Sequence, residues 1–356
     1  MAHTAFKKLF GIALAIGAIG SASANPTAGF LGPQTPAITA GALPDSPGNR
    51  VDPNVASSRF SGVVSLQIVK NNQVYICTGT LVSKRSVVTA GHCVDTNGNG
   101  AVIDPNAPGN SVHAIFNATS SGPGRAAIQA TAVSMHADYA GFGKCPAGVS
   151  GFCTNDDVAV VTLGQDAPAE AKIYKIATTE LMAGSRIIMA GYGTSGDGVN
   201  GFTVSPAWRV KRSGQNYIDF FTGDDEKNRS SGKEIWYADF DGNGIDDFCT
   251  YYGMCTPVLP NDVESGIGGG DSGGPSFVEM YGELMLIATN TFTNANGYTA
   301  GTFGSYFGGM VLNGYLDYIR EATGGKAQFI PEPATTAIFG LGLLALAGAR
   351  RRKQQK

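Results

Sequence analysis

Three short segments of the sequence carry the side-chain types that nucleophilic catalysis needs. They read Thr89-Ala90-Gly91-His92-Cys93, Asp156-Asp157-Val158-Ala159-Val160-Val161 and Gly268-Gly269-Gly270-Asp271-Ser272-Gly273-Gly274-Pro275. A serine hydroxyl becomes an effective nucleophile when a neutral imidazole takes its proton, and the imidazole needs a carboxylate on its other nitrogen. We therefore predict Ser272 as the nucleophile, His92 as the general base and Asp157 as the orienting carboxylate.

The glycines around Ser272 meet a second requirement of this chemistry. Consecutive glycines let backbone N–H groups converge on one point, where they stabilise a tetrahedral oxyanion. The same run satisfies the short Gly-x-Ser-x-Gly pattern of α/β-hydrolase esterases, which place their histidine after the serine. The histidines of this chain are His3, His92, His113 and His136. None of them follows Ser272, so that class of enzyme is excluded.

Short β-rich runs recur from Val63 onwards, separated by Gly, Asn, Asp and Ser. They cover residues 63–69, 74–79, 86–90, 158–163, 186–191 and 284–291. Because no long helical periodicity interrupts them, the pattern predicts an all-β body of the sandwich or barrel type. A helix is expected only near the end of the body, where Leu312, Tyr315, Leu316 and Ile319 share one face.

The three catalytic segments resemble the signature motifs of the trypsin-like (chymotrypsin-type) serine proteases. Thr-Ala-Gly-His-Cys matches the histidine motif, Gly-Asp-Ser-Gly-Gly-Pro matches the serine motif, and the chain order His, Asp, Ser is the family's. Asp157 matches the family's acid because it directly precedes Val-Ala-Val-Val, whereas its rival Asp156 stands one place earlier. Residues 185–194 resemble the opening strand of the family's second barrel, and residues 315–321 resemble its closing helix.

The resemblance implies two antiparallel six-stranded β-barrels with the triad at their junction and a short C-terminal helix. It places the oxyanion hole at the backbone N–H groups of Gly270 and Ser272, and it pairs Cys77 with Cys93. It further implies a serine endopeptidase that cleaves protein or peptide substrates through an acyl-enzyme and requires no cofactor.

The sequence departs from the family's pattern at the specificity pocket. Gly268 stands where the family usually has a cysteine, and Gly266 stands at the base of the pocket. Because Gly266 carries no carboxylate, cleavage after Lys or Arg is not implied, and an apolar or small substrate side chain is expected. Glu264 would reach the pocket only in a shifted register.

Proteolytic activation is a further expectation from the resemblance. In the family, a newly cut N-terminus pairs with the aspartate before the serine, here Asp271, and orders the oxyanion hole. Arg50-Val51 is the candidate cut, since Val51 lies the family's usual distance before His92. The residues that follow, Val51-Asp52-Pro53-Asn54, differ from the family's Ile-Val-Gly-Gly.

Composition and cysteine usage indicate a folded, exported protein. With 43% hydrophobic and 15% charged residues, the chain is unlike a disordered one. The net charge of −3 and the lack of a basic stripe exclude nucleic acid as a partner. No C-x-x-C motif is present, so a zinc ribbon is not expected. The six cysteines allow 15 pairings, and the sequence alone does not choose among them. They fall into three local pairs, Cys77 and Cys93, Cys145 and Cys153, and Cys249 and Cys255, which favours three loop-closing disulfides in an oxidising compartment.

Both ends of the chain read as targeting segments. Lys7 and Lys8, an apolar run and Ser21-Ala22-Ser23-Ala24 predict a signal peptide over residues 1–24. Residues 25–50 are expected to form a linker or pro-segment, and residues 51–324 the protease domain. Residues 325–356 combine Pro331-Glu332-Pro333, an apolar stretch and a basic cluster, and they resemble the PEP-CTERM sorting signal.

The sorting resemblance implies a location and a partner. An exosortase-type enzyme would recognise the tail and pass the protein to the cell surface or extracellular matrix of a Gram-negative bacterium. Until then the short apolar helix would hold the chain in the inner membrane, and it is the only expected membrane contact. A permanent inner-membrane anchor is the alternative for this segment.

Two loops rich in Asp and Asn raise the question of calcium. The loop that starts at Asp239 matches the first nine positions of a calcium loop, with Asp239, Asp241, Asn243 and Asp247 as ligands. Thr250 stands where the bidentate Glu would be. The loop of residues 95–100 is a weaker copy. A structural calcium site and a solvated Gly/Asn turn are both open for each loop.

Two functions are compatible with these features. The first is an exported serine endopeptidase acting through His92, Asp157 and Ser272. The second is a catalytically silent surface or matrix protein that keeps the same fold for binding. The first is preferred, because a chain relieved of chemistry has no need for all three triad members.

Overall fold

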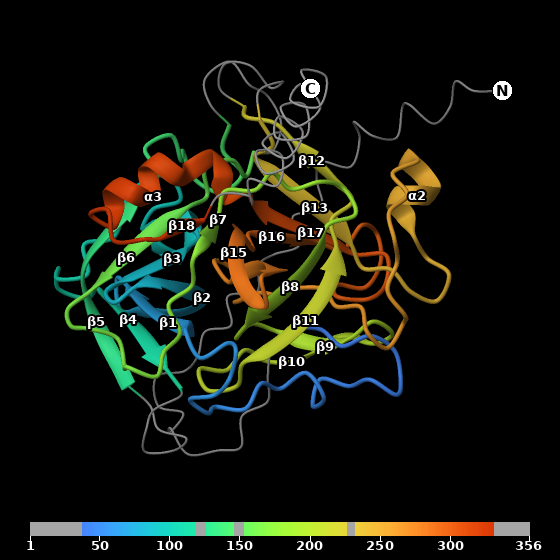
Figure 1. Ribbon diagram of the computed structural model, residues 1–356, viewed down its shortest axis with the longest axis horizontal. Helices are drawn as coiled ribbons and strands as arrows, with labels where there is room; N and C mark the ends of the chain where they lie inside the picture. The colour runs from blue at the N-terminus through green and yellow to red at the C-terminus, as the bar shows by residue number, and fades with distance from the viewer. Residues whose placement is uncertain (1–37, 118–125, 146–152, 226–231, 331–356) are drawn as a thin grey trace, which may run out of the picture.

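The computed structural model describes residues 38–117, 126–145, 153–225 and 232–330 (Figure 1). The predicted signal peptide and the apolar and basic parts of the predicted sorting tail lie outside these residues. Two β-rich halves stand side by side, and the C-terminal helix α3 lies over the first of them. The predicted all-β class is therefore confirmed.

The first half is a closed barrel of six antiparallel strands, paired in the order β1-β2-β3-β6-β5-β4. The strands are β1 (Val63–Lys70), β2 (Gln73–Ser83), β3 (Ser86–Thr89), β4 (Ser111–Phe116), β5 (Ala126–Met135) and β6 (Ala159–Leu163). The hairpin between β1 and β2 turns at Asn71 and Asn72, which both have positive φ, as the tight turns that suit strand twist require. In β5 the buried Ile128 and Ala130 alternate with exposed neighbours, which is the pattern of a strand with one solvated face.

The second half contains the remaining strands in three hydrogen-bonded groups. Strands β11 (Arg212–Tyr217), β8 (Arg186–Gly191), β14 (Pro275–Met280), β15 (Glu283–Thr289), β7 (Ile176–Ala177) and β18 (Phe329–Ile330) form a six-stranded sheet in that order. Strands β12 (Phe220–Thr222), β13 (Ile235–Asp239), β17 (Tyr306–Met310) and β16 (Phe292–Asn294) form a four-stranded sheet, and β9 (Ser195–Asp197) pairs with β10 (Gly201–Val204).

Two bent strands join the larger sheets into a second ring. β11 continues into β12 after Ile218 and Asp219, and β15 continues into β16 after Asn290 and Thr291. With each of these counted as one strand, antiparallel pairing runs from β8 through β11/β12, β13, β17, β16/β15 and β14 back to β8. Six strands thus close the second barrel, while β7 and β18 add short parallel pairings at its edge.

Helical structure is sparse and short. The helices are α1 (Gly91–Val94), α2 (Asp247–Tyr252), the 3-10 helix η1 (Leu312–Tyr315) and α3 (Leu316–Ala322). The last two confirm the predicted C-terminal helix. α3 belongs to the end of the second half but reaches the first barrel, where the hydroxyl groups of Tyr318 and Ser134 on β5 lie 2.9 Å apart.

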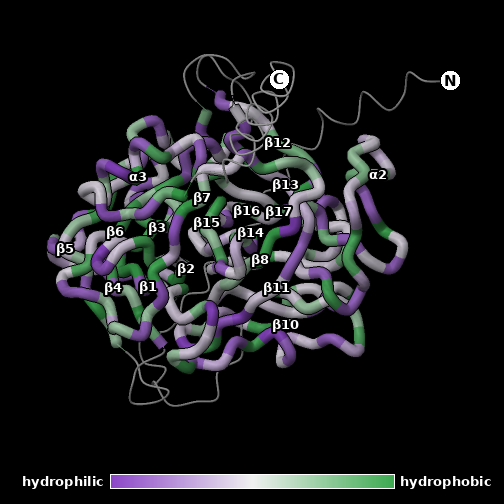
Figure 2. The backbone as a smooth tube through the Cα atoms, in the orientation of Figure 1, coloured by the Kyte–Doolittle hydropathy of each residue, from purple (hydrophilic) through white to green (hydrophobic). Residues whose placement is uncertain are grey.

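A shared apolar core joins the two barrels. One cluster contains Val88 and Val160 from the first barrel together with Phe277 and Leu286 from the second. Figure 2 shows hydrophobic residues along the strands of both halves and hydrophilic residues mainly in the loops that connect them. Because cores are close-packed and transmit displacement, the junction between the barrels is a fixed frame for side chains that face it.

The folded body is longer at both ends than the sequence indicated. Residues 38–50 were expected in a linker without a core, yet Ile38 is fully buried in the core of the second barrel. At the other end, β18 pairs with β7, so the body continues past residue 324 to residue 330. Neither segment has a helical or strand-like hydrophobic periodicity in its sequence. Their backbones are held in place by contacts with strands that lie far along the chain.

Candidate active site

Strand pairing brings His92 and Asp157 together. β3 and β6 are antiparallel neighbours, with Thr89 paired to Ala159. His92 follows the end of β3 on the single turn α1, and Asp157 comes just before β6 begins. In an antiparallel pair the end of one strand meets the start of the other, so the two side chains share one edge of the first barrel.

Asp157 holds His92 at two points. Its Oδ2 lies 2.8 Å from His92 Nδ1, and its Oδ1 accepts a hydrogen bond of 2.6 Å from the backbone N–H of His92. The carboxylate is fully buried, while the imidazole side chain is 22% exposed. This geometry leaves Nε2 as the ring nitrogen that can serve as a base, because a proton on Nδ1 is fixed by the carboxylate.

The neighbouring Asp156 belongs to a different group. Its Oδ1 lies 2.9 Å from Nδ1 of His136, and its backbone N–H donates to the hydroxyl of Tyr315. The turn that separates the two acids includes Asp156 at a φ of 58°. Adjacent carboxylates thus point to two different histidines, and Asp157 is the one that reaches His92.

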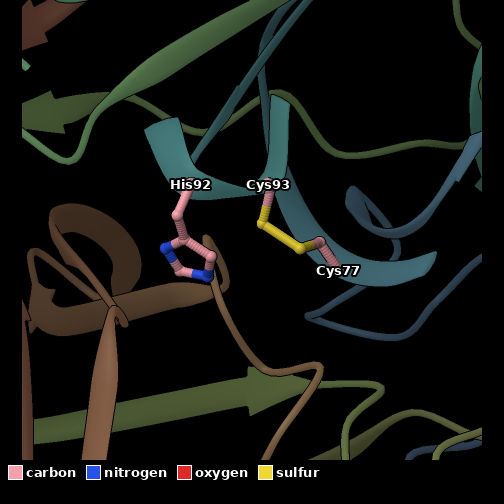
Figure 3. Close-up of side chains that lie close together, drawn as sticks. All are labelled: Cys77, His92 and Cys93. Atoms are coloured by element: carbon pink, nitrogen blue, oxygen red, sulfur yellow. A yellow bond between two sulfur atoms is a disulfide. The ribbon is translucent and has the colours of Figure 1, made fainter. Parts of the chain in front are cut away.

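Ser272 is held against the first barrel by Thr78 on β2. The backbone N–H of Thr78 donates to the carbonyl of Ser272 at 2.9 Å, and its hydroxyl donates to the carbonyl of Gly270 at 2.9 Å. The Sγ atom of Cys93 lies 3.7 Å from the same Ser272 carbonyl. Figure 3 shows the imidazole of His92 beside the Cys77–Cys93 disulfide, so the histidine and the serine loop flank one covalent link.

The structure places Ser272 in this site without closing the last hydrogen bond of the triad. Within the described ranges, the Ser272 hydroxyl and Nε2 of His92 make no hydrogen bond to each other. Catalytic hydrogen bonds are often long in ligand-free enzymes and shorten when substrate binds. Ser272 is half-buried, which leaves its hydroxyl accessible to a substrate.

The predicted oxyanion donors lie on a strained, glycine-rich turn. Gly270 has a φ of 102°, and a Cβ there would lie 2.9 Å from the Cα of Gly193. Only glycine fits both the backbone conformation and this close approach. In the part of the chain that the structure covers, the N–H groups of Gly270 and Ser272 donate to no protein acceptor, so both are available to a ligand oxygen.

Asp271 is fully buried beneath the serine turn. Its carboxylate accepts hydrogen bonds from the backbone N–H groups of Gly193 (2.8 Å), Gly268 (2.9 Å) and Ile38. Burial raises the pKa of Asp271 to about 6, and these donors together with the charge of Arg212 oppose that rise. The carboxylate is therefore a polar anchor for three separate stretches of backbone.

In the uncut chain, the residues at the expected activation cut make contacts elsewhere than at Asp271. Val51 is 40% exposed and bridges to Arg212, and the Arg50 guanidinium donates to Asp45 and to the carbonyl of Val263. It is Ile38 that reaches Asp271. The signal that identifies it is Ile38-Thr39-Ala40-Gly41, which resembles the family's Ile-Val-Gly-Gly. Spacing from His92 favoured Val51, because spacing alone does not show which residue reaches Asp271.

The predicted pocket residue Gly266 lies in the interior of the second barrel. Its backbone N–H donates to Thr39 Oγ1 at 2.7 Å, and a Cβ on it would lie 3.5 Å from Phe240. Glu264 does not face this position. Its two oxygens accept from the backbone N–H groups of Asp241 and Leu259, and its side chain belongs to a separate acidic group.

The predicted calcium ligands are brought together only in part. Asp239 and Asp241 lie close to each other, but Asp247 turns away and accepts hydrogen bonds from Asn296 and Tyr298. Asn243 is exposed at the tip of the loop, where its side chain bonds Asn261. Asp246 takes the place expected for Asp247.

The weaker loop copy folds as a self-contained turn. Asp95 accepts hydrogen bonds from the backbone N–H groups of Asn97, Gly98 and Gly100, so both of its oxygens are engaged within the loop.

All three predicted local disulfides are present: Cys77–Cys93, Cys145–Cys153 and Cys249–Cys255. With its sulfurs bonded to each other, the Cys77–Cys93 pair beside His92 offers no thiolate to a metal.

Comparison with protein-family models gives two matches along the chain. Residues 53–217 match the Trypsin family model, a range that includes His92 and Asp157 and ends before Ser272. Residues 329–353 match the PEP-CTERM protein-sorting motif. Both predicted resemblances are confirmed: the chain carries a trypsin-like domain and a C-terminal PEP-CTERM motif.

Solved structures and curated proteins complete the comparison. A structure of HL collagenase is similar, with 16% identity, a TM-score of 0.49, and coverage of 78% of this chain and 98% of that chain. No curated protein matches the sequence significantly. Between residues 38 and 330, in the ranges given above, no helix is both long and apolar enough for a membrane span. The apolar stretch of the sorting motif lies outside those ranges.

We predict that the Thr78 hydroxyl positions the serine turn. Thr78→Val removes a donor to Gly270 and an acceptor for the Tyr192 N–H, and buried groups left unpaired cost about 1–3 kcal/mol. The variant should lose that much in the free energy of unfolding and react more slowly at Ser272. Thr80→Val is the control, because the Thr80 hydroxyl is buried without a hydrogen bond in the described structure. Equal losses in both variants would contradict this role.

We predict that Asp157, and not Asp156, supports catalysis by His92. Asp157→Asn should lower kcat by about 10⁴-fold, because the amide fixes the wrong imidazole tautomer. Asp156→Asn should retain most of the activity, since its amide can still bond His136. Kinetics with a peptide substrate, with the fold checked by circular dichroism, make the comparison. A loss in Asp156→Asn as large as in Asp157→Asn would reverse the assignment.

Proposed function

We propose that this protein is a serine endopeptidase that works through Ser272, His92 and Asp157. The observation that carries the proposal is the double contact of Asp157 with His92, made beside a serine turn that Thr78 fastens to the same barrel. A buried carboxylate with two hydrogen bonds to one histidine fixes that imidazole in the tautomer needed for base catalysis.

The mechanism follows from these positions. The Ser272 oxygen attacks the carbonyl carbon of the scissile peptide bond while His92 Nε2 takes the hydroxyl proton. The oxyanion of the tetrahedral intermediate accepts hydrogen bonds from the N–H groups of Gly270 and Ser272. His92 then gives its proton to the leaving amine, and the acyl-enzyme remains on Ser272. Water attacks the ester in the same way, with His92 again as base, and releases the acid product.

The substrate side chain at the cleaved bond is apolar or small. Support comes from Gly266 at the predicted base of the pocket, where no carboxylate is available to pair with a Lys or Arg. Glu264, the nearest acid in sequence, is fully buried and hydrogen-bonded elsewhere. Sequencing of products from a peptide-library digest identifies the preferred residue.

Export and sorting determine where this activity operates. The N-terminal signal peptide would release the chain into an oxidising compartment, where its three disulfides form. The PEP-CTERM motif implies recognition by an exosortase in a Gram-negative bacterium. After removal of the tail, the protease would act on proteins at the cell surface or in the extracellular matrix.

Maturation by a cut before Ile38 is part of the proposal. The Ile38 backbone N–H already donates to Asp271, and the hydroxyl of Ser195 donates to the Ile38 carbonyl. A cut would convert this N–H into a charged amine at the same carboxylate. A buried ion pair gains more than a neutral hydrogen bond where further donors satisfy the carboxylate, as Gly193 and Gly268 do here.

Covalent labelling tests the proposed activity. A fluorophosphonate probe should label the folded protein at Ser272, because only a serine activated by a base reacts at a useful rate. Labelling should disappear in Ser272→Ala and after heat denaturation, and it should persist in Ser185→Ala, whose serine lies outside the site. A matured, folded protein that the probe does not label at Ser272 would favour the silent binding protein on the same fold.

N-terminal sequencing of labelled enzyme tests the maturation step. We expect Ile38 as the first residue of the form that reacts with the probe, because only that terminus lies at Asp271. Arg50→Gln should still mature to Ile38 and react with the probe, because cleavage before Ile38 does not require Arg50, although the loss of its bonds to Asp45 and Val263 should lower its thermal midpoint. Recovery of Val51 as the N-terminus of reactive enzyme, or loss of maturation in Arg50→Gln, would return the cut to the Arg50-Val51 bond.

A further inference from the structure

A turn at the end of β13 gathers carboxylates in the interior of the second barrel. Asp239 is the last residue of β13 and is 1% exposed, and Asp241 is 4% exposed. Asn243 and Gly244 both have positive φ and reverse the chain between Gly242 and Ile245, which exchange two backbone hydrogen bonds. The reversal places Asp246, at the start of α2, beside the first two acids.

These three carboxylates offer oxygens to one common point. One oxygen from each of Asp239, Asp241 and Asp246 lies within 4.8 Å of the other two. In the described structure, Oδ1 of Asp239 and Oδ1 of Asp241 are buried and have no hydrogen-bond partner. The other oxygen of Asp239 accepts from the N–H of Phe248 at 2.9 Å, which fixes the orientation of the carboxylate.

Two further acids hold the backbone of this turn. Asp219 Oδ2 accepts from the N–H of Asp239 at 3.0 Å, and Glu264 Oε1 accepts from the N–H of Asp241 at 2.8 Å. Five carboxylates therefore meet in one buried region. Among the described residues, no ion pair includes any of the five.

Burial of so much negative charge without a positive partner is costly. An isolated carboxylate in a low-dielectric interior either takes up a proton or pairs with a cation. The geometry, with two orphaned oxygens facing a third carboxylate, is that of a binding site for a cation.

We propose that Asp239, Asp241 and Asp246 bind a calcium ion. Calcium prefers carboxylate oxygens at about 2.3–2.6 Å, so two ligands on opposite sides of one ion lie about 4.8 Å apart. The observed spread of the three oxygens fits that limit. Asp219 and Glu264 position the ligands through the backbone, and water completes the coordination.

The proposed ligands differ from a linear calcium-loop pattern by one residue. The linear pattern assigns Asp247 as a calcium ligand, but both of its carboxylate oxygens accept hydrogen bonds from the side chains of Asn296 and Tyr298. The tight reversal at Asn243 and Gly244 brings Asp246 inward instead. This difference supplies a matched pair of adjacent acids, one inside the site and one outside it.

The decisive experiment measures calcium-dependent stability in the exported chain carrying Ser272→Ala. This background cannot digest itself, and its stability does not depend on the proposed hydrolysis, so a failure here leaves the protease proposal untouched. At calcium about one hundred times its dissociation constant, the thermal midpoint should rise by about 5 °C over the EDTA-treated sample. Isothermal titration with calcium chloride should give about one ion per chain at this site.

Two substitutions in that background locate the ion. Asp241→Asn should abolish the calcium-dependent rise, and in EDTA it should melt no lower than its parent, because it removes a buried like charge. Asp247→Asn should keep the full rise. An unfolded Asp241→Asn variant is recognised by its low midpoint in EDTA, and Asp246→Asn, on the half-buried ligand, then provides the same test.

Either of two results overturns the proposal. One is an unchanged midpoint with calcium in the parent, which means that protons alone neutralise the cluster. The other is a calcium-dependent rise that survives in both Asp241→Asn and Asp246→Asn, which places the ion elsewhere in the chain.

Discussion

The contact of Thr78 with the serine turn is the constraint on which the site depends, because His92 and Ser272 belong to different barrels. Thr78 donates to the carbonyls of Gly270 and Ser272, and its own carbonyl accepts from Thr89, just before the histidine turn. The proposed proton transfer needs the side chains of His92 and Ser272 within about 3.2 Å of each other. A single buried residue that bonds both sides of the junction limits how far the barrels can shift.

The second barrel buries carboxylates in two different environments. Asp271 is surrounded by backbone donors and the charge of Arg212, so its carboxylate is satisfied where it lies. The acids around Asp241 have backbone donors for some oxygens and none for others. Because unpaired buried charge costs far more than paired charge, the first arrangement is complete within the chain, and the second is the one for which we propose a bound cation.

The hydrophobic patterns and short motifs of the sequence predicted the strands and turns that depend mainly on nearby residues. β8 and the β3–β6 pair follow apolar, β-branched runs, and the motifs around His92 and Ser272 specify their own turns. Ile38 and Thr78 were missed because their roles come from partners far along the chain. Asp246 was missed for a different reason: a two-residue reversal shifted the inward-facing acid by one position, and ligand spacing alone does not show which turn the backbone will adopt.

The segment from Glu264 to Ser272 shows why those distant partners are necessary. It is rich in glycine, and fixing each residue costs about 1–2 kcal/mol of conformational entropy, more for glycine than for any other. Thr39 exchanges two hydrogen bonds with Gly266, Asp241 binds Glu264, and Thr78 binds the serine end. The serine turn is thus held at both ends by residues from distant parts of the chain. A free N-terminus at Ile38 and a cation at Asp241 would each strengthen one of these contacts, so maturation and metal binding converge on the same nine-residue stretch.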